Sequence, residues 1–223
     1  MAKRTQNQQS QLLSDIHNFN INYDTRELFL GFRDDDEESQ YVTPKMTSLL
    51  LKNLRWLNSI NKDPILIHLS SPGGYVSDSF TIYEAVKNSN AHITMVGYGE
   101  IMSAAVLIML AADTRLLTKT SSFMVHGTNS GFEGGANHLQ SSLEEVKRLE
   151  KVTYELYADK CKDGQFFKER NYTASKTRLY LIDRINKKHD WYLTPEEAKY
   201  YGFIDGVIGD TKYPEIKSYG WTT

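Results

Sequence analysis

Two short apolar segments, each followed by a glycine turn and a helical pattern, constrain the fold of this chain most. Ile65–Leu69 runs into the turn Ser71–Gly74, and His92–Val96 runs into the turn Gly97–Gly99. A helix is expected after each turn, the second one beginning near Ser103. Strands that alternate with helices at this spacing predict βαβ crossovers and a parallel sheet covered by helices. The fold class is therefore α/β.

Composition narrows the class of protein. The chain has 223 residues, which suits a single domain, and its net charge of -2 leaves no basic excess to neutralise a run of phosphates. We therefore expect no nucleic acid partner. The longest apolar stretch, about Ala104–Ala112, is too short to cross a bilayer, and the polar segment Met1–Gln11 lacks the apolar core of a secretory signal. With Cys161 as the only cysteine, the sequence predicts a cytoplasmic protein without disulfides.

The second half of the chain predicts further strands at 114–117 and 122–126 and one unusually long helix. Leu139, Leu143, Val146 and Leu149 begin an apolar stripe that continues to Leu156 at helical spacing. The stripe is long for a helix that lies on its own domain. It therefore predicts contact with another subunit.

Ser103 is the first residue with catalytic potential. It stands at a predicted helix start, where free backbone N–H groups and the positive end of the helix dipole favour a developing anion. Two interpretations are open, because most serines at such positions only cap the helix. A serine nucleophile also needs a base and a group that orients the base.

Of the six histidines, His126 has the position expected of that base. It closes the apolar strand Ser122–Val125 and is followed by Gly127, so it lies at a strand end facing a loop. Asp190 precedes Trp191 in an aromatic segment that we expect to shield the carboxylate from water. The residues alone do not favour Asp190 over the other two candidates, Asp183 and Asp205.

Several blocks, taken together, resemble the Clp protease proteolytic-subunit (ClpP) family. They are Ser71–Gly74 after an apolar strand, Gly99-x-x-x-Ser103, Phe123–His126, Asp190-x-x-Leu193 through Ala198, and Tyr201–Asp205. The resemblance covers roughly residues 26–209 in the family's order of blocks. It implies a crotonase-like (ClpP) ββα spiral fold with a protruding handle helix. It also implies an ATP-dependent serine endopeptidase subunit that cleaves unfolded polypeptides inside an oligomeric chamber.

The resemblance also implies roles for individual residues. Ser103 is the nucleophile, His126 the general base and Asp190 its orienter, while the backbone amides of Gly74 and Ala104 form an oxyanion hole. No metal and no cofactor is expected. The residues that the resemblance places along the bound substrate strand are Gly73, Tyr75, Val76, Ser130, Gly131 and Phe132.

The family's architecture and partners enter as expectations in the same way. They divide the chain into a polar N-terminal segment (1–24), a head domain (25–135 and 161–212) and a handle helix (136–160). They imply a homo-oligomer of two stacked heptameric rings and an AAA+ unfoldase such as ClpX or ClpA. Four departures indicate a divergent member of the kind found in phages or mobile elements. They are Glu100 near the nucleophile, Ala104-Ala105 after it, a longer stretch around Cys161–Tyr172, and the segment Met1–Asp24, which lacks the family's usual apolar axial-loop pattern.

Two other functions remain open at this stage. A crotonase-type acyl-CoA hydratase or isomerase also builds an oxyanion hole from two backbone amides, and would use a carboxylate such as Glu100 as acid and base. A non-catalytic subunit of a mixed Clp ring is the other alternative. Its usual sign is the loss of a triad residue, whereas Ser103, His126 and Asp190 are all present.

Overall fold

The computed structural model of the protein describes residues 5–32, 37–129, 131 and 135–216. Its strands are β1 (Ile21–Asn22), β2 (Glu27–Leu30), β3 (Ile65–Ser71), β4 (Ile93–Met102), β5 (Thr114–Leu117), β6 (Ser122–Val125), β7 (Trp191–Leu193) and β8 (Gly206–Val207). Its helices are α1 (Gln6–Phe19), the 3-10 helix η1 (Glu37–Gln40), α2 (Pro44–Ile60), α3 (Val76–Lys87), α4 (Ala104–Ala111), α5 (Ala136–Cys161), α6 (Gln165–Glu169), α7 (Ala174–Lys188) and α8 (Pro195–Tyr201).

The strands form one sheet that divides at β4. The main path runs β1-β2-β3-β4-β5-β8 and is parallel from β2 onward. The first part of β4 pairs with β5 and the second part pairs with β6, which in turn pairs with β7. The predicted strand His92–Val96 is therefore only the beginning of a longer one. It continues through the glycine segment because both halves of β4 find a neighbour.

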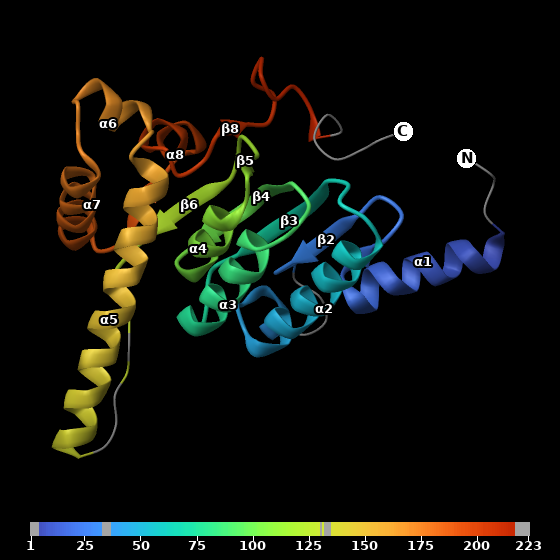
Figure 1. Cartoon of the computed structure of the whole chain (residues 1–223), viewed down its shortest axis with the longest axis horizontal. Helices are drawn as coiled ribbons and strands as arrows, with labels where there is room; N and C mark the ends of the chain where they lie inside the picture. The colour runs from blue at the N-terminus through green and yellow to red at the C-terminus, as the bar shows by residue number, and fades with distance from the viewer. Residues whose placement is uncertain (1–4, 33–36, 130, 132–134, 217–223) are drawn as a thin grey trace.

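Helices α2, α3 and α4 cover one face of the sheet (Figure 1). Helix α2 begins where its sequence predicts, since Thr43 accepts a hydrogen bond from the backbone of Met46 and Pro44 occupies the first turn. Every residue of α4 is buried, which is why this helix is apolar all round. On the opposite face, Tyr213 from the C-terminal segment packs on Leu66 and Val96 of β3 and β4.

Helix α5 projects away from the body of the molecule, whereas α6, α7 and α8 gather near its C-terminal end (Figure 1). Its outer half exposes Leu139 and Leu143, and its inner half is buried at Tyr157, Ala158 and Cys161. The predicted long helix is thus present, and its outer apolar stripe lies free of the body.

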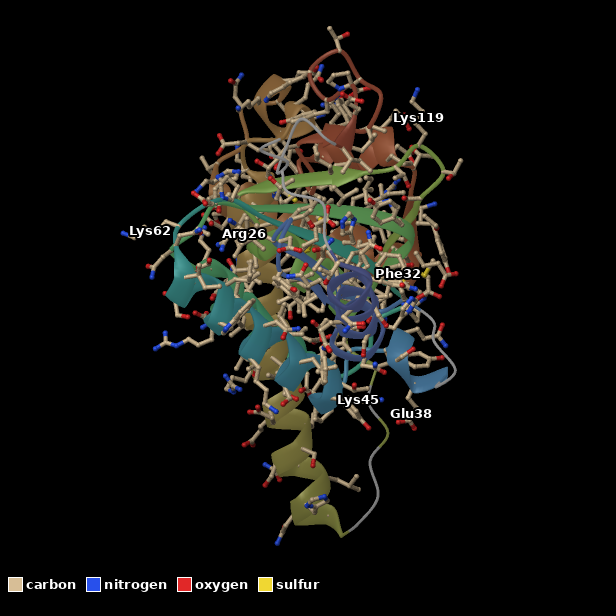
Figure 2. All side chains as sticks on the ribbon, turned by 90° about the vertical axis from the view of Figure 1, so that its right-hand side faces the viewer. Arg26, Phe32, Glu38, Lys45, Lys62 and Lys119 are labelled. Carbon is tan, nitrogen blue, oxygen red and sulfur yellow. The ribbon has the colours of Figure 1, made fainter. Side chains whose placement is uncertain are left out.

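The buried cation Arg26 fastens the start of β2 to the loop that precedes β3. Its guanidinium donates hydrogen bonds to the carbonyl oxygens of Leu57 and Asp63. Lys62 and Lys119, by contrast, project from the periphery (Figure 2). Within the described residues, no helix combines the length and apolarity that crossing a membrane requires.

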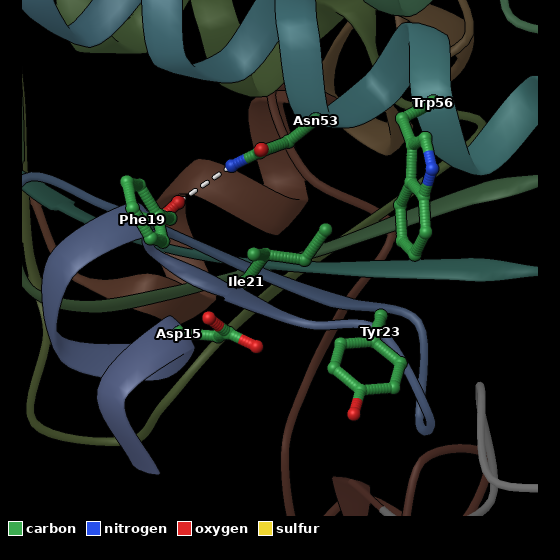
Figure 3. Close-up of a pocket in the computed structure, with 6 residues that line it drawn as sticks. All are labelled: Asp15, Phe19, Ile21, Tyr23, Asn53 and Trp56. Atoms are coloured by element: carbon green, nitrogen blue, oxygen red, sulfur yellow. Dashed lines mark hydrogen bonds between the residues drawn. The ribbon is translucent and has the colours of Figure 1, made fainter. Parts of the chain in front are cut away.

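An apolar groove lies where α1 meets the sheet (Figure 3). The side-chain amide of Asn53 on α2 donates a 2.6 Å hydrogen bond to the carbonyl oxygen of Phe19, which holds the end of α1. Phe19, Tyr23 and Trp56 line the groove, together with Ile21. Phe19 and Trp56 remain about half exposed, so this surface is apolar and open in the single chain.

Candidate active site

Ser103 sits at the junction between β4 and α4 in a strained backbone conformation. Its φ of 53° and ψ of -124° lie outside the regions that L-residues favour. A 2.9 Å hydrogen bond from its N–H to the carbonyl oxygen of Met124 holds it there. Its side chain makes no capping hydrogen bond to α4. Of the two interpretations of Ser103, simple helix capping is therefore wrong.

The Ser103 hydroxyl is instead hydrogen-bonded to His126. The distance from His126 Nε2 to Ser103 Oγ is 2.7 Å. The two residues meet because β4 and β6 are parallel neighbours in which Met102 pairs with Met124, so Ser103 and His126, which directly follow the two strands, lie at the same edge of the sheet. A nucleophile and base at this distance can transfer a proton directly.

Asp190 is placed by the pairing of β6 with β7. Val125 pairs with Trp191 in an antiparallel register, so Asp190 comes opposite His126 at the end of the two strands. Both residues line one cavity. Within the described part of the chain, however, the Asp190 carboxylate makes no hydrogen bond to the imidazole, and its role as orienter stays a prediction.

The expectation that neighbouring aromatic residues shield Asp190 is wrong. Asp190 is exposed in the single chain, and so is Tyr192. Trp191 turns inward and packs edge-on against Tyr201 and Phe203. Side chains alternate along a strand, so Trp191 contributes to the core rather than covering the preceding residue.

The glycine turn after β3 packs directly against the nucleophile. Gly73 has a φ of 107°, and a Cβ built there would lie 2.7 Å from Ser103 Cβ and 3.1 Å from the Ala104 nitrogen. Only glycine permits this approach. Gly74 and Ala104 line the same cavity as Ser103. Because Ala104 is the first residue of α4, its N–H has no acceptor inside the helix.

The residues expected along the substrate strand have different surroundings in the structure. The carbonyl oxygen of Gly73 and the N–H of Tyr75 are already paired with Val42, at 2.8 and 2.9 Å. Tyr75 is 63% exposed, whereas Val76 lines the cavity beside the nucleophile. Gly131 is an exposed residue without regular structure. The remaining two, Ser130 and Phe132, lie outside the described residues.

A cavity of about 140 Å³ opens beside the Ser103–His126 pair. Val76 and Leu107 form apolar walls, and Thr153 and Tyr157 contribute from the inner half of α5. Thr153 and Tyr157 do not belong to the apolar stripe that the sequence predicts for this helix. Their spacing of four residues, which places them on one face, was the signal that could have found them.

Helix α5 also holds the loop that follows His126. The backbone N–H of Thr128 donates a 3.2 Å hydrogen bond to the Glu150 carboxylate. A Cβ built on Gly127 would lie 3.3 Å from the same carboxylate oxygen. Glu150 therefore helps to fix the path of the chain after His126.

Two other candidate groups lie away from the cavity. Glu100 is exposed on β4 opposite Ser122 and does not line the space beside Ser103, so the expectation of a carboxylate near the nucleophile is not met. Cys161 is fully buried, and burial raises the pKa of its thiol well above the usual range. The thiol therefore stays protonated and inaccessible, which removes it as a nucleophile.

Comparisons with known proteins agree with this geometry, which is that of a serine hydrolase built on an α/β sheet. Residues 23–211 match the profile of the Clp protease family. The chain belongs to the Clp protease family, and the expectation of a Clp-type serine protease is confirmed.

Individual relatives are distant but extensive. The chain is 28% identical to the ATP-dependent Clp protease proteolytic subunit 2 of Pseudomonas aeruginosa, over 75% of this chain and 77% of that protein. It is 27% identical to the ATP-dependent Clp protease proteolytic subunit of Chlorella vulgaris, over 87% of each chain. An asparagine-to-aspartate mutant of ClpP1 from Listeria monocytogenes superposes with a TM-score of 0.66 at 23% identity, covering 86% of this chain and 96% of that one. The expected ClpP fold is confirmed.

The close approach of the glycine turn makes a testable prediction. In Gly73→Ala, the new Cβ must displace Ser103 or the Ala104 amide, and we expect hydrolysis of a peptide substrate to fall by roughly a hundredfold, the cost of losing about one oxyanion donor. The matched control is Gly135→Ala, where an added Cβ meets no atom of the described residues within 4 Å. Equal rates for the two variants, measured on folded protein, would show that the approach of Gly73 does not matter.

Proposed function

We propose that this chain is the peptidase subunit of a compartmental Clp protease, with Ser103 as nucleophile, His126 as general base and Asp190 as orienter. The observation that carries the proposal is the 2.7 Å hydrogen bond between His126 Nε2 and Ser103 Oγ. Its context supports the same roles, because Ser103 is held in a strained turn at a helix start instead of capping it. The substrate is an extended polypeptide.

In the proposed reaction, His126 accepts the Ser103 proton while Oγ attacks the peptide carbonyl. The backbone N–H groups of Gly74 and Ala104 stabilise the oxyanion, a contribution of about 3–4 kcal/mol for one such donor. His126 then protonates the leaving amine as the acyl-enzyme forms. Water, deprotonated by the same imidazole, attacks the ester and releases the acid and Ser103.

We propose that the Asp190 carboxylate reaches His126 Nδ1 by side-chain rotation. The backbone register supports this, since it already sets the two residues opposite each other. The exposure of Asp190 in the single chain supports it too, because an exposed side chain is less hindered by packing than a buried one. An imidazole oriented in this way presents Nε2 to the nucleophile in its acceptor form.

The acyl-CoA hydratase alternative has less support. Its acid and base would be carboxylates facing the oxyanion amides, and no aspartate or glutamate of the described residues lines the cavity beside Ser103. The nearest carboxylate in sequence, Glu100, faces solvent.

A fluorophosphonate probe tests the proposal. We expect the probe to label the wild-type protein at Ser103 and to leave Ser103→Ala unlabelled, because only an activated serine displaces the fluoride. Intact-mass and peptide-mass measurements give the site. An unlabelled wild-type protein that nonetheless turns over an enoyl-CoA would favour the hydratase.

The proposed role of Asp190 has its own test. In Asp190→Asn the imidazole loses the partner that fixes its tautomer, and we expect kcat for peptide hydrolysis to fall by roughly 10⁴-fold with little change in KM. Asp183→Asn, in an exposed ion pair with Lys187 on α7, is the control. If both variants retain wild-type kcat, Asp190 is not the orienter.

We further propose that the chain works as a cytoplasmic homo-oligomer of two stacked heptameric rings served by an AAA+ unfoldase. The exposed apolar residues of the projecting helix α5 support the assembly, because leaving them in water is unfavourable. The apolar groove of Figure 3 is a second surface that a partner would cover. The unfoldase would supply extended polypeptide, since a cavity of about 140 Å³ admits a side chain and not a folded protein.

The assembly makes a prediction about α5. Leu143 is 46% exposed on the outer half of this helix, and Leu143→Asp would place a charge in the proposed ring–ring contact. We expect sedimentation of the wild type to give a species many times the 25.6 kDa subunit mass, and Leu143→Asp to give smaller species. The control is Glu144→Ala, one position around the same helix. A wild-type protein that stays at subunit mass at micromolar concentration would contradict the assembly.

A further inference from the structure

Apolar and polar side chains both line the cavity beside Ser103, and its polar lining includes His126, Thr128 and Asn129 as well as two residues of α5. Leu107 and Val76 supply the walls, while Thr153 and Tyr157 project from the inner half of α5. Thr153 is 8% exposed and Tyr157 is 2% exposed, so both side chains are more than nine-tenths buried. Four residues apart on one helix, the two side chains lie on the same face of α5.

Neither hydroxyl has a hydrogen-bond partner within the described part of the chain. Thr153 does not bond back to the carbonyl oxygen of the preceding turn, although Ser141 on the same helix does so, at 3.1 Å. The hydroxyl of Thr177 is both unpaired and completely shielded from solvent. The hydroxyls of Thr153 and Tyr157 are unpaired but not completely shielded. The small exposed area of each residue therefore includes its hydroxyl, and the space that both residues line is the cavity.

Two buried hydroxyls that await partners define what the cavity can bind. A polar group buried without a partner is costly, so a ligand that satisfies both is favoured over an apolar one of equal size. Burial also raises the pKa of Tyr157 well above that of an ordinary tyrosine. Its phenol therefore stays protonated and can donate to a carbonyl oxygen.

The size and surroundings of the cavity narrow the choice further. Its volume of about 140 Å³ is close to that of a cavity that holds one benzene molecule, about 150 Å³. One side chain of medium length fits. No lysine or arginine of the described residues lines it, so a carboxylate would lose its water without gaining a counter-charge.

We propose that this cavity is the primary specificity subsite and that it selects glutamine as the residue on the acyl side of the cleaved bond. The inference rests on the proposed function, because Ser103, Gly74 and Ala104 line the same cavity. The side chain of the residue whose carbonyl is attacked enters the remaining space. Its amide oxygen accepts from the Tyr157 hydroxyl and its amide nitrogen donates to the Thr153 hydroxyl.

The test compares substrates that differ only in that residue. Peptidyl aminocoumarin amides ending in Gln, Met or Glu are offered to the assembled full-length protein, and kcat/KM is measured for each. We expect Gln to exceed Met, which has the same length, by roughly tenfold, the effect of about one hydrogen bond. We expect Glu to be cleaved more slowly than either.

Variants assign the preference to the hydroxyls. Tyr157→Phe and Thr153→Val remove an oxygen with little change in the size of the side chain, and each is expected to lower the Gln/Met ratio by about threefold, an equal share of the roughly tenfold preference. Thr153→Ser retains a hydroxyl and is expected to keep the ratio. Tyr154→Phe removes a hydroxyl from the same helix but outside the cavity lining, and is expected to leave the ratio unchanged.

The outcomes separate this inference from the proposed function. If the fluorophosphonate probe labels Ser103 and Met is cleaved as well as Gln, or if Tyr157→Phe leaves the ratio unchanged, the glutamine subsite is wrong and the peptidase stands. If Ser103 is not labelled, both proposals fail together. If Ser103 is labelled but the short amides are not cut, cleavage sites in unfolded β-casein decide, and the absence of glutamine enrichment before the cut overturns the subsite.

Discussion

The active-site arrangement depends on β4 being shared between two neighbouring strands. Its first half pairs with β5 and its second half with β6. The change of partner extends β4 far enough for Ser103 to leave the sheet beside His126. If β4 had ended where its apolar segment ends, Ser103 would lie in a loop several residues beyond the strand. The pairing with β6 would then not bring it beside His126. Backbone hydrogen bonds therefore set the spacing of the pair.

Some contacts of the site are already formed in the single chain and others are not. The Ser103–His126 hydrogen bond is already made in the single chain, and Gly73 packs closely against Ser103 and the Ala104 nitrogen. Asp190 has the correct backbone position, opposite His126, but its carboxylate is turned to solvent. The difference follows from packing: the first two contacts lie against buried elements, and Asp190 lies at an exposed strand end.

Local sequence patterns were sufficient for the fold class, for the helices that follow the two glycine turns and for the long helix α5. Thr43-Pro44 marks the start of α2, and Gly202 ends α8 in the left-handed conformation that its position predicts. Ser103 and His126 could also be found, because each follows a short apolar strand. The pairing of β4 with two strands could not, since it joins segments distant in the chain. Nor could the direction of Trp191, which is decided by its contacts with Tyr201 and Phe203.

Helix α5 joins two surfaces that a sequence pattern treats as separate. Its outer half carries exposed leucines, and its inner half forms the end of the cavity and holds the loop after His126 through Glu150. A continuous helix transmits displacement along its axis, because each turn is hydrogen-bonded to the next. A shift at its outer end would therefore alter both the shape of the cavity beside Ser103 and the orientation of the His126 imidazole. Lineages that change how their subunits stack would then be expected to drift in which bonds they cut.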